Sequence, residues 1–132
     1  MIRSWQIPQH YMSIARYMEI EIPVSRIQVN NRLIDAVTVE VIRTDDLGLW
    51  LEIGRTQAGY HYSITYAVST GGGSGGVYVN SPRAKDKTEA LLGGLREAAG
   101  SYWITRHDGA AARIEAAVRE VENYKATQLT LF

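Results

Sequence analysis

The nine residues Tyr60–Val68, which read Tyr-His-Tyr-Ser-Ile-Thr-Tyr-Ala-Val, decide the fold class of this chain. Large apolar residues stand at every second position, and this is the period of a β-strand, whose successive side chains point to opposite faces. Exposed tyrosines could stack on nucleic-acid bases, but a strand face covered by helices is more often core. We therefore expect one core face and one opposite face, made respectively of Tyr60, Tyr62, Ile64, Tyr66 and Val68, and of His61, Ser63, Thr65 and Ala67.

Further strands are expected before this one. The segments Arg26–Val29 and Leu33–Arg43 flank two asparagines, which tolerate the left-handed backbone of a tight hairpin turn. Leu49–Ile53 alternates like a strand that begins after a break at Gly48 and ends at Gly54. Nearer the start, Gln9–Ile22 predicts a short helix that runs into a strand, although residues 9–19 alone are compatible with either structure.

A glycine-rich stretch, Gly71–Gly76, follows the central strand. Such a stretch could cradle a phosphate, but it lacks the Lys-Ser/Thr pair of a nucleotide-binding loop and precedes a strand pattern. We expect a mobile hairpin loop that leads into Val77–Asn80, the predicted partner of the central strand.

The period then changes from two to 3.6. Asp86, with Glu89 three positions later, is typical of a helix start, in which a side chain satisfies a free backbone N–H. The first helix would bury Leu91, Leu92, Leu95, Ala98, Ala99, Tyr102 and Trp103. A second helix, beginning at Asp108, would turn inward Ile114, Ala117, Val118, Val121 and Tyr124.

This order of elements predicts an α+β fold, with a mostly antiparallel sheet of about five strands and two C-terminal helices packed on one of its faces. The chain has 132 residues, of which 45% are hydrophobic, so one domain is sufficient. We place that single domain at residues 1–124 and a C-terminal tail at residues 125–132.

Composition limits the classes of function. Fourteen basic residues balance fourteen acidic ones, so the whole surface does not attract polyanions as a strongly basic domain does. There is no cysteine, which excludes disulfides and cysteine-ligated zinc. No signal peptide and no run of about eighteen apolar residues is visible, so we expect a soluble, cytoplasmic protein without membrane contact.

The tail carries the most specific pattern in the sequence. After Tyr124 the helical period stops, and Lys125–Thr127 is expected to form a short polar link into Gln128, Leu129, Thr130, Leu131 and Phe132. These five residues resemble the Gln-Leu-Ser/Asp-Leu-Phe peptide by which bacterial polymerases, mismatch-repair proteins and replication regulators bind the sliding clamp. Four positions match, and Thr130 replaces the commoner serine or aspartate.

The resemblance implies a role for each tail residue. Gln128 would hydrogen-bond at the rim of a groove on the clamp, the β subunit of the replicative polymerase. Leu131 and Phe132 would fill an apolar pocket, and Leu129 would add an auxiliary contact. Burying a leucine and a phenylalanine stabilises a complex by roughly 1.5 to 3 kcal/mol each, enough for micromolar docking after ordering costs. The alternative is a last strand or staple on the protein's own core, because Gln128–Leu131 also alternates with period two.

A second candidate site is basic. Arg83, Lys85 and Lys87 stand near a helix N-terminus, which favours anions, so they are possible phosphate contacts, although a solvated loop explains them equally well. The stretch Leu49–Trp103 also looks loosely like small antitoxins of the HicB type, with Lys87, Thr88, Glu89 and Ala90 in place of their Thr-Glu-Glu-Ala helix. The same order of elements occurs in double-stranded RNA-binding domains, so the likeness does not choose a function.

No catalytic constellation, metal site or cofactor site is indicated, because the three histidines are scattered and no nucleophile elbow is present. The sequence predicts a non-enzymatic accessory protein of bacterial, phage or plasmid DNA replication or repair. It would dock on the sliding clamp and join the nucleoid when bound, with DNA as a possible further partner. The alternative is a nucleic-acid-binding or HicB-like regulator whose tail is purely structural.

Overall fold

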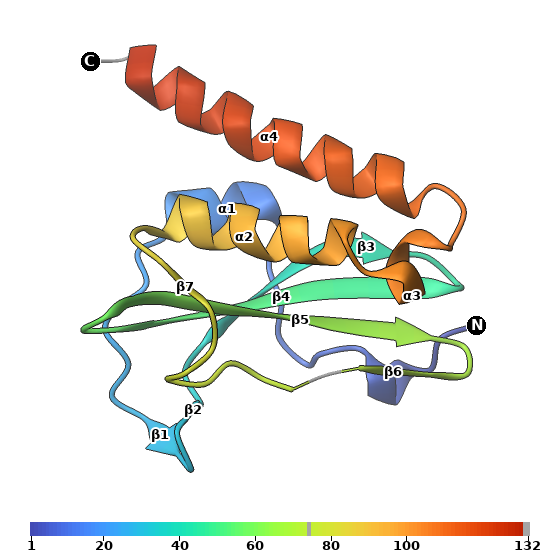
Figure 1. Cartoon of the computed structure of the whole chain (residues 1–132), viewed down its shortest axis with the longest axis horizontal. Helices are drawn as coiled ribbons and strands as arrows, with labels where there is room; N and C mark the ends of the chain where they lie inside the picture. The colour runs from blue at the N-terminus through green and yellow to red at the C-terminus, as the bar shows by residue number, and fades with distance from the viewer. Residues whose placement is uncertain (74, 131–132) are drawn as a thin grey trace.

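The computed structural model describes the chain except for Ser74, Leu131 and Phe132 and the side chains of Leu129 and Thr130. It has three layers: helices above a central sheet, and irregular segments with a small hairpin below (Figure 1). Helices and a mostly antiparallel sheet therefore form an α+β fold, as predicted.

The main sheet runs in the order β3 (Val37–Arg43), β4 (Leu47–Thr56), β5 (Gly59–Val68) and β6 (Gly71–Gly73), all antiparallel. β5 is the predicted central strand, and its tyrosine face packs against the core below the helices. β4 is longer than predicted, since Gly48 and Gly54 lie inside it. A Cβ on Gly48 would come within 2.1 Å of the buried Trp50 ring, so glycine makes room here for the indole instead of ending the strand.

The predicted pairing of Val77–Asn80 with β5 is wrong. β5 pairs instead with β6 and, further along the same edge, with β7 (Arg83–Ala84). Gly71–Gly73 is thus a strand and not a loop, because residues without side chains can approach the Tyr66 backbone closely. Val77 is buried on the lower side, where its carbonyl accepts a 2.9 Å hydrogen bond from the Leu33 N–H.

The predicted asparagine hairpin is present as β1 (Gln28–Val29) and β2 (Arg32–Leu33), and Asn30 and Asn31 have φ angles of 53° and 67°. It forms a separate two-stranded sheet, because the chain bends after β2 before β3 joins the main sheet. The predicted early helix is α1 (Ile14–Glu19), preceded by the short 3-10 helix η1 (Ser4–Gln6). No strand follows α1 directly, and only an isolated bridge joins Val24 to Arg55.

α2 (Lys87–Ala99) begins as predicted, with the Asp86 side chain accepting a 2.8 Å hydrogen bond from the Glu89 N–H. It ends at Gly100, and α3 (Tyr102–Thr105) starts a new direction. The prediction that Ala99, Tyr102 and Trp103 face the core is therefore wrong, since Ala99 is exposed and the two aromatic residues are 69% and 58% exposed.

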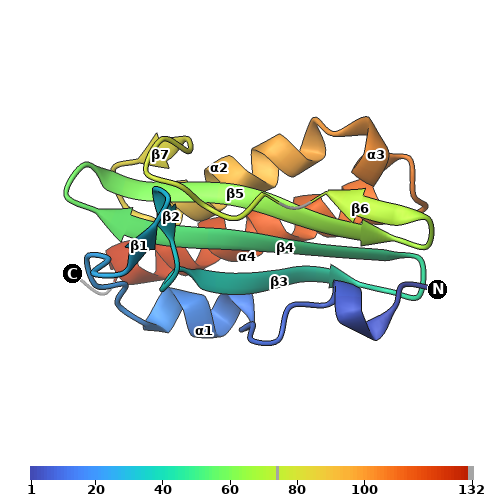
Figure 2. The ribbon, with the colours of Figure 1, turned by 90° about the horizontal axis from the view of Figure 1, so that it is seen from below.

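The last helix, α4 (Ala110–Thr130), lies between α1 and α2 when the molecule is seen from below (Figure 2). Its predicted inward residues Ile114, Ala117 and Val121 are buried, and Val118 and Tyr124 pack half-buried at the edge of the core. The helices thus cover one face of the sheet and leave the other to the N-terminal segment and the hairpin.

Candidate functional site

The predicted polar link at Lys125–Thr127 is not a link, because α4 continues without a break to Thr130. Lysine, alanine and glutamine are good helix formers, and no glycine or proline interrupts them. Thr127 fits into the helix by donating a 2.9 Å hydrogen bond to the Asn123 carbonyl. The apolar period ends at Tyr124 because the helix passes the edge of the domain there, and not because the helix ends.

The end of α4 projects away from the body of the protein (Figure 1). Val121 is fully buried, Tyr124 is half-buried, and residues 125–128 are all exposed. Lys125 still touches the body through an ion pair with Glu89, at 3.2 Å. Gln128, the first residue of the candidate docking segment, is therefore a solvent-exposed residue on the last turns of a helix.

The other docking residues are described in part. Leu129 and Thr130 have helical backbones, so a last strand does not form at residues 128–130. The side chains of Leu129 and Thr130, and all of Leu131 and Phe132, lie outside the described residues. The roles that the resemblance gives to the side chains of Leu129, Thr130, Leu131 and Phe132 therefore depend on the sequence alone.

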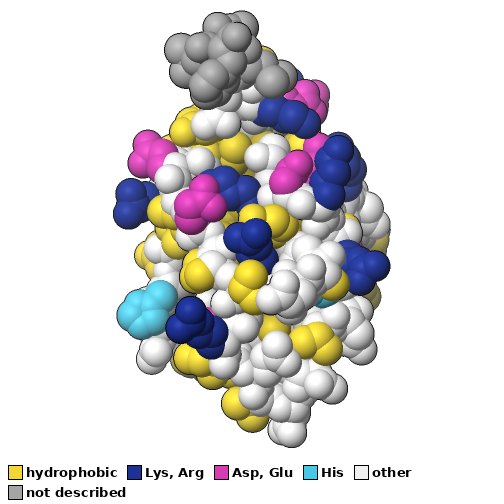
Figure 3. Space-filling model, turned by 90° about the vertical axis from the view of Figure 1, so that its left-hand side faces the viewer, with side chains coloured by type: hydrophobic (Ala, Val, Ile, Leu, Met, Phe, Trp, Pro, Cys, Tyr) yellow, Lys and Arg dark blue, Asp and Glu magenta, His cyan; other side chains and the backbone are white. Residues whose placement is uncertain are grey.

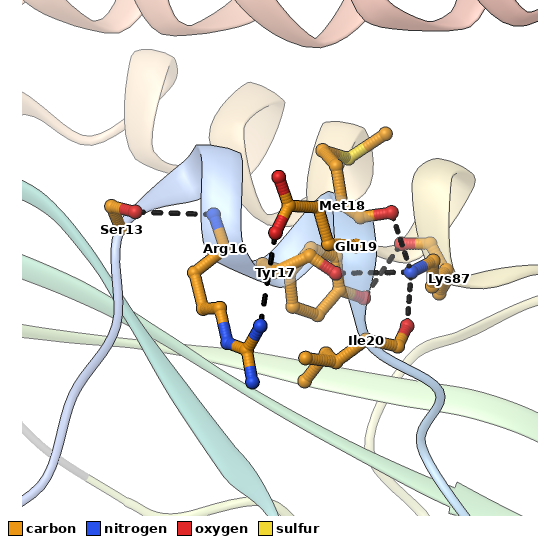
Figure 4. Close-up of polar contacts among 7 residues, drawn as sticks. All are labelled: Ser13, Arg16, Tyr17, Met18, Glu19, Ile20 and Lys87. Carbon is orange, nitrogen blue, oxygen red and sulfur yellow. Dashed lines mark hydrogen bonds and ion pairs between the residues drawn. The ribbon is translucent and has the colours of Figure 1, made fainter.

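The basic candidates divide into two kinds. Arg83 on β7 and Lys85 after it are exposed, whereas Lys87 is half-buried at the start of α2. The Lys87 ammonium donates to the carbonyls of Tyr17 and Met18, each at 3.0 Å, and to that of Ile20 (Figure 4). An ammonium has three N–H donors, so all of them are used.

Lys87 thus acts as a cap for α1, whose last carbonyls have no partners within the helix. Burial lowers the pKa of the Lys87 ammonium, and the nearby Glu21 opposes this shift. The group lies 5.5 Å from the centre of the Tyr17 ring, a further attraction for a cation. Of the three predicted phosphate contacts, the structure leaves Arg83 and Lys85 available to a ligand.

The surface around this end of the molecule mixes charges. Figure 3 shows lysine and arginine side chains interspersed with acidic ones near the end of α4, and no continuous basic field. This agrees with the balance of fourteen basic and fourteen acidic residues in the chain. Any contact with phosphate would therefore depend on a few side chains and not on the field of the whole surface.

His61 is held by structural contacts. His61 is 1% exposed and contacts the Thr56 hydroxyl at 2.7 Å and the Ser81 carbonyl at 3.1 Å. Within the described residues, no three His, Cys, Asp or Glu side chains come together to hold a metal ion. None of the helices described is long and apolar enough to cross a membrane.

One polar residue was missed by the sequence analysis. Glu52 lies on the lower face of β4, half-buried, while Leu49, Leu51 and Ile53 point into the core. The alternation of Leu49–Ile53 could have indicated Glu52, because it places this acid on the face opposite three apolar residues.

Comparison of the chain with family models, with curated proteins and with solved structures found no match.

Proposed function

We propose that this chain is a binding protein that docks on the bacterial sliding clamp through Gln128–Phe132. The pattern of the five residues is the basis of the proposal, and the exposure of residues 125–128 is the structural observation that supports it. A docking peptide has to be reachable from outside the domain. Gln128, the residue of the peptide whose side chain is described, meets this requirement, and the inward stripe of α4 ends before it, at Tyr124.

Docking requires the end of α4 to open. The resemblance implies an extended peptide in a groove, whereas residues 128–130 are helical in the free chain. The last four carbonyls of a helix have no hydrogen-bond partner within it, so unwinding the final turn breaks few bonds. Burial of Leu131 and Phe132 in the clamp pocket would stabilise the complex by roughly 1.5 to 3 kcal/mol per side chain, enough to offset this cost.

The test measures binding of the whole protein to a purified bacterial clamp by calorimetry. Interfaces concentrate their energy in a few anchors, so replacing both Leu131 and Phe132 by alanine should abolish binding. Thr130→Ser should preserve or strengthen it, because serine is common at that place in the motif. Ala126→Ser serves as the matched control, since it changes an exposed residue of the same helix outside the motif. The absence of any complex at tens of micromolar would refute the proposal.

Such a protein would act in the cytoplasm, on the nucleoid, in DNA replication or repair of a bacterium, phage or plasmid. The folded domain would then bring a second partner to the clamp. It would need no catalytic group or cofactor of its own for this role.

The second candidate is nucleic-acid binding through Arg83, on β7, and Lys85, directly after it, which are both exposed. The test is DNA and RNA binding at low salt with both residues replaced by glutamine. Loss of these contacts should weaken binding and flatten its salt dependence. If the unaltered protein binds neither nucleic acid, this candidate is eliminated, and clamp docking is unaffected.

A further inference from the structure

The lower face of the sheet carries a row of polar side chains across three strands. Thr38 on β3 is paired with Glu52 on β4, and Glu52 is paired with Ser63 on β5. Residues that are directly opposite on adjacent strands point to the same face, so the three side chains stand side by side. This face is the one that the helices do not cover.

The side chains of Glu52 and Ser63 have no partner among the described residues. The Glu52 side chain is half-buried and makes no hydrogen bond or ion pair with any other described residue. The Ser63 hydroxyl is buried and is likewise without a hydrogen-bond partner in the part of the chain that the structure describes. A charged carboxylate that lines a hollow and has no donor from the protein can accept one from a ligand, so Glu52 indicates a place for a ligand.

A neighbouring glutamate shows the contrast. Glu40 is one row away on the same face, and its Oε1 accepts hydrogen bonds from Trp50 Nε1, at 3.1 Å, and from Arg43 Nε, at 2.7 Å. The fold thus satisfies Glu40 with an indole N–H and a guanidinium. It leaves Glu52, at a similar depth, with no such donor.

Glu52 also lies where two hollows meet. One has a volume of about 660 Å³ and includes Tyr11 and Thr38 in its wall, and the other, of about 510 Å³, includes Trp5 and Thr65. Glu52 and Pro8 line both of them. Ligand sites are usually concave, with a few polar groups that fix orientation, and the Glu52 carboxylate is such a group here.

The aromatic side chains in these walls suit a cation. Trp5 is 75% exposed, and Tyr11 already holds a cation, since the Arg43 guanidinium lies 4.6 Å from the centre of its ring. Arg32 also lines the larger hollow, but its guanidinium packs against the backbone of Gly76 and forms no ion pair with Glu52. The carboxylate charge is therefore left for a ligand to neutralise.

We propose that the hollow around Glu52 binds an organic cation, an ammonium or guanidinium group, such as a free polyamine or a basic side chain of a partner. The Glu52 carboxylate would accept charge-assisted hydrogen bonds, which are the strong ones. The Thr38 hydroxyl, which lines the larger hollow, would accept a further N–H group. An aromatic ring of Trp5 or Tyr11 would cover the alkyl part of the ligand.

The experiment is an NMR titration of the whole protein with agmatine, spermidine and Nα-acetyl-arginine methylamide. The citrulline analogue of the last compound, which has the same shape without the charge, is the matched ligand control. Shifts are expected at the amides of Thr38, Glu52 and Ser63 for the cations but not for the citrulline compound. Stronger binding of agmatine or spermidine supports a free amine as the ligand, and stronger binding of the arginine compound supports a protein side chain.

Variants separate this site from general charge attraction. Glu52→Gln keeps the shape and removes the charge, so cation binding should weaken at least about tenfold. Glu120→Gln removes an exposed carboxylate on α4 and should leave binding unchanged. Equal binding by the Glu52 variant and the unaltered protein would overturn the proposal, and so would equal binding of the citrulline compound. The absence of any shift at 10 mM ligand would also overturn it, because this concentration is about 10⁴ times a micromolar dissociation constant. None of these outcomes bears on clamp docking.

Discussion

Tyr17 and Lys87 are joined by reciprocal hydrogen bonds: the Tyr17 hydroxyl donates to the Lys87 carbonyl at 2.8 Å, and the Lys87 ammonium donates to the Tyr17 carbonyl at 3.0 Å. This contact connects the end of α1 to the start of α2 through two residues that are 70 positions apart in the sequence. It explains why a lysine that resembles a ligand contact in the sequence is instead a structural group.

Replacing Lys87 by methionine should destabilise the protein by about 1–3 kcal/mol, because three carbonyls at the end of α1 lose their donor in a half-buried place. Methionine retains most of the side-chain volume, so the effect reports on the hydrogen bonds. Thermal unfolding is the measurement, and Lys85→Met, at an exposed position, is the control with little expected change. Equal melting temperatures for the two variants would contradict the capping role.

The stability of the protein should fall as pH rises above about 10. Burial raises the pKa of the Tyr17 hydroxyl far above its usual value, with smaller contributions from Tyr60 and Asp86. Below pH 10 the Tyr17 hydroxyl keeps its proton in both the folded and the unfolded chain, so its contribution to stability is intact. Above it the unfolded chain ionises and the folded one does not, which favours unfolding. The lowered pKa of Lys87 acts in the opposite direction, but its shift is the smaller one.

Tyr17→Phe should therefore flatten the dependence of stability on alkaline pH, although the variant is less stable at neutral pH because it loses a hydrogen bond. Denaturant unfolding at several values between pH 8 and pH 11 measures this slope. Tyr102→Phe, at a 69% exposed tyrosine, should leave the slope unchanged. A Tyr17→Phe variant that keeps the full slope would show that other groups cause it.

Removal of residues 128–132 should leave the melting temperature nearly unchanged, because the described core ends with Val121 and the half-buried Tyr124. Ile114→Ala, in the buried stripe of the same helix, should lower the free energy of unfolding by about 2–5 kcal/mol. This variant shows the size of effect expected for a residue of the core. If the truncated protein melts several degrees lower, the tail packs on the domain, and the purely structural role of these residues is favoured.

Glu52→Gln should leave the free energy of unfolding unchanged or raise it, because the unpaired carboxylate contributes no described contact. Glu40→Gln should lower it by about 1 kcal/mol or more, since this variant weakens the hydrogen bonds with Trp50 and Arg43. Equilibrium denaturation of the two variants compares these glutamates directly. A larger loss at Glu52 than at Glu40 would show that Glu52 has a structural partner.

Gly72→Ala should destabilise the edge of the sheet, because a Cβ at this position would lie 2.3 Å from the Tyr66 carbonyl oxygen. The backbone must shift to relieve such a contact, and we expect a cost of about 1–3 kcal/mol. Gly75→Ala is the matched control, since no atom lies within 4 Å of a Cβ added there. Comparable stabilities of the two variants would argue against the observed pairing of β6 with β5.

Several features could be predicted because neighbouring residues encode them. The period of two in Tyr60–Val68 predicts β5, Asn30 and Asn31 predict a tight turn, and Asp86 predicts the start of α2. Each depends on a steric or hydrogen-bonding preference that acts over a few residues.

The predictions at glycine residues were wrong in two ways. Gly48 and Gly54 were expected to end strands and lie within β4, and Gly71–Gly73 was expected to be a loop and forms β6. A glycine that gives conformational freedom and a glycine that gives space have the same appearance in a sequence. The buried Trp50 ring and the Tyr66 carbonyl, which need that space, come close only in the folded sheet.

By itself the sequence determined β5, the asparagine turn, the start of α2, the inward stripe of α4 and the pattern of the candidate docking segment. All of these depend on residues that are close to one another in the sequence. Only the tertiary structure decided that Lys87 caps α1, that β5 pairs with β6 and β7, and that Glu52 stays unpaired beside two hollows. The physical reason is that a hydrogen-bond donor, a free strand edge or a neighbouring charge becomes available only when distant segments pack together. The periodicity of a sequence does not indicate which segments these are.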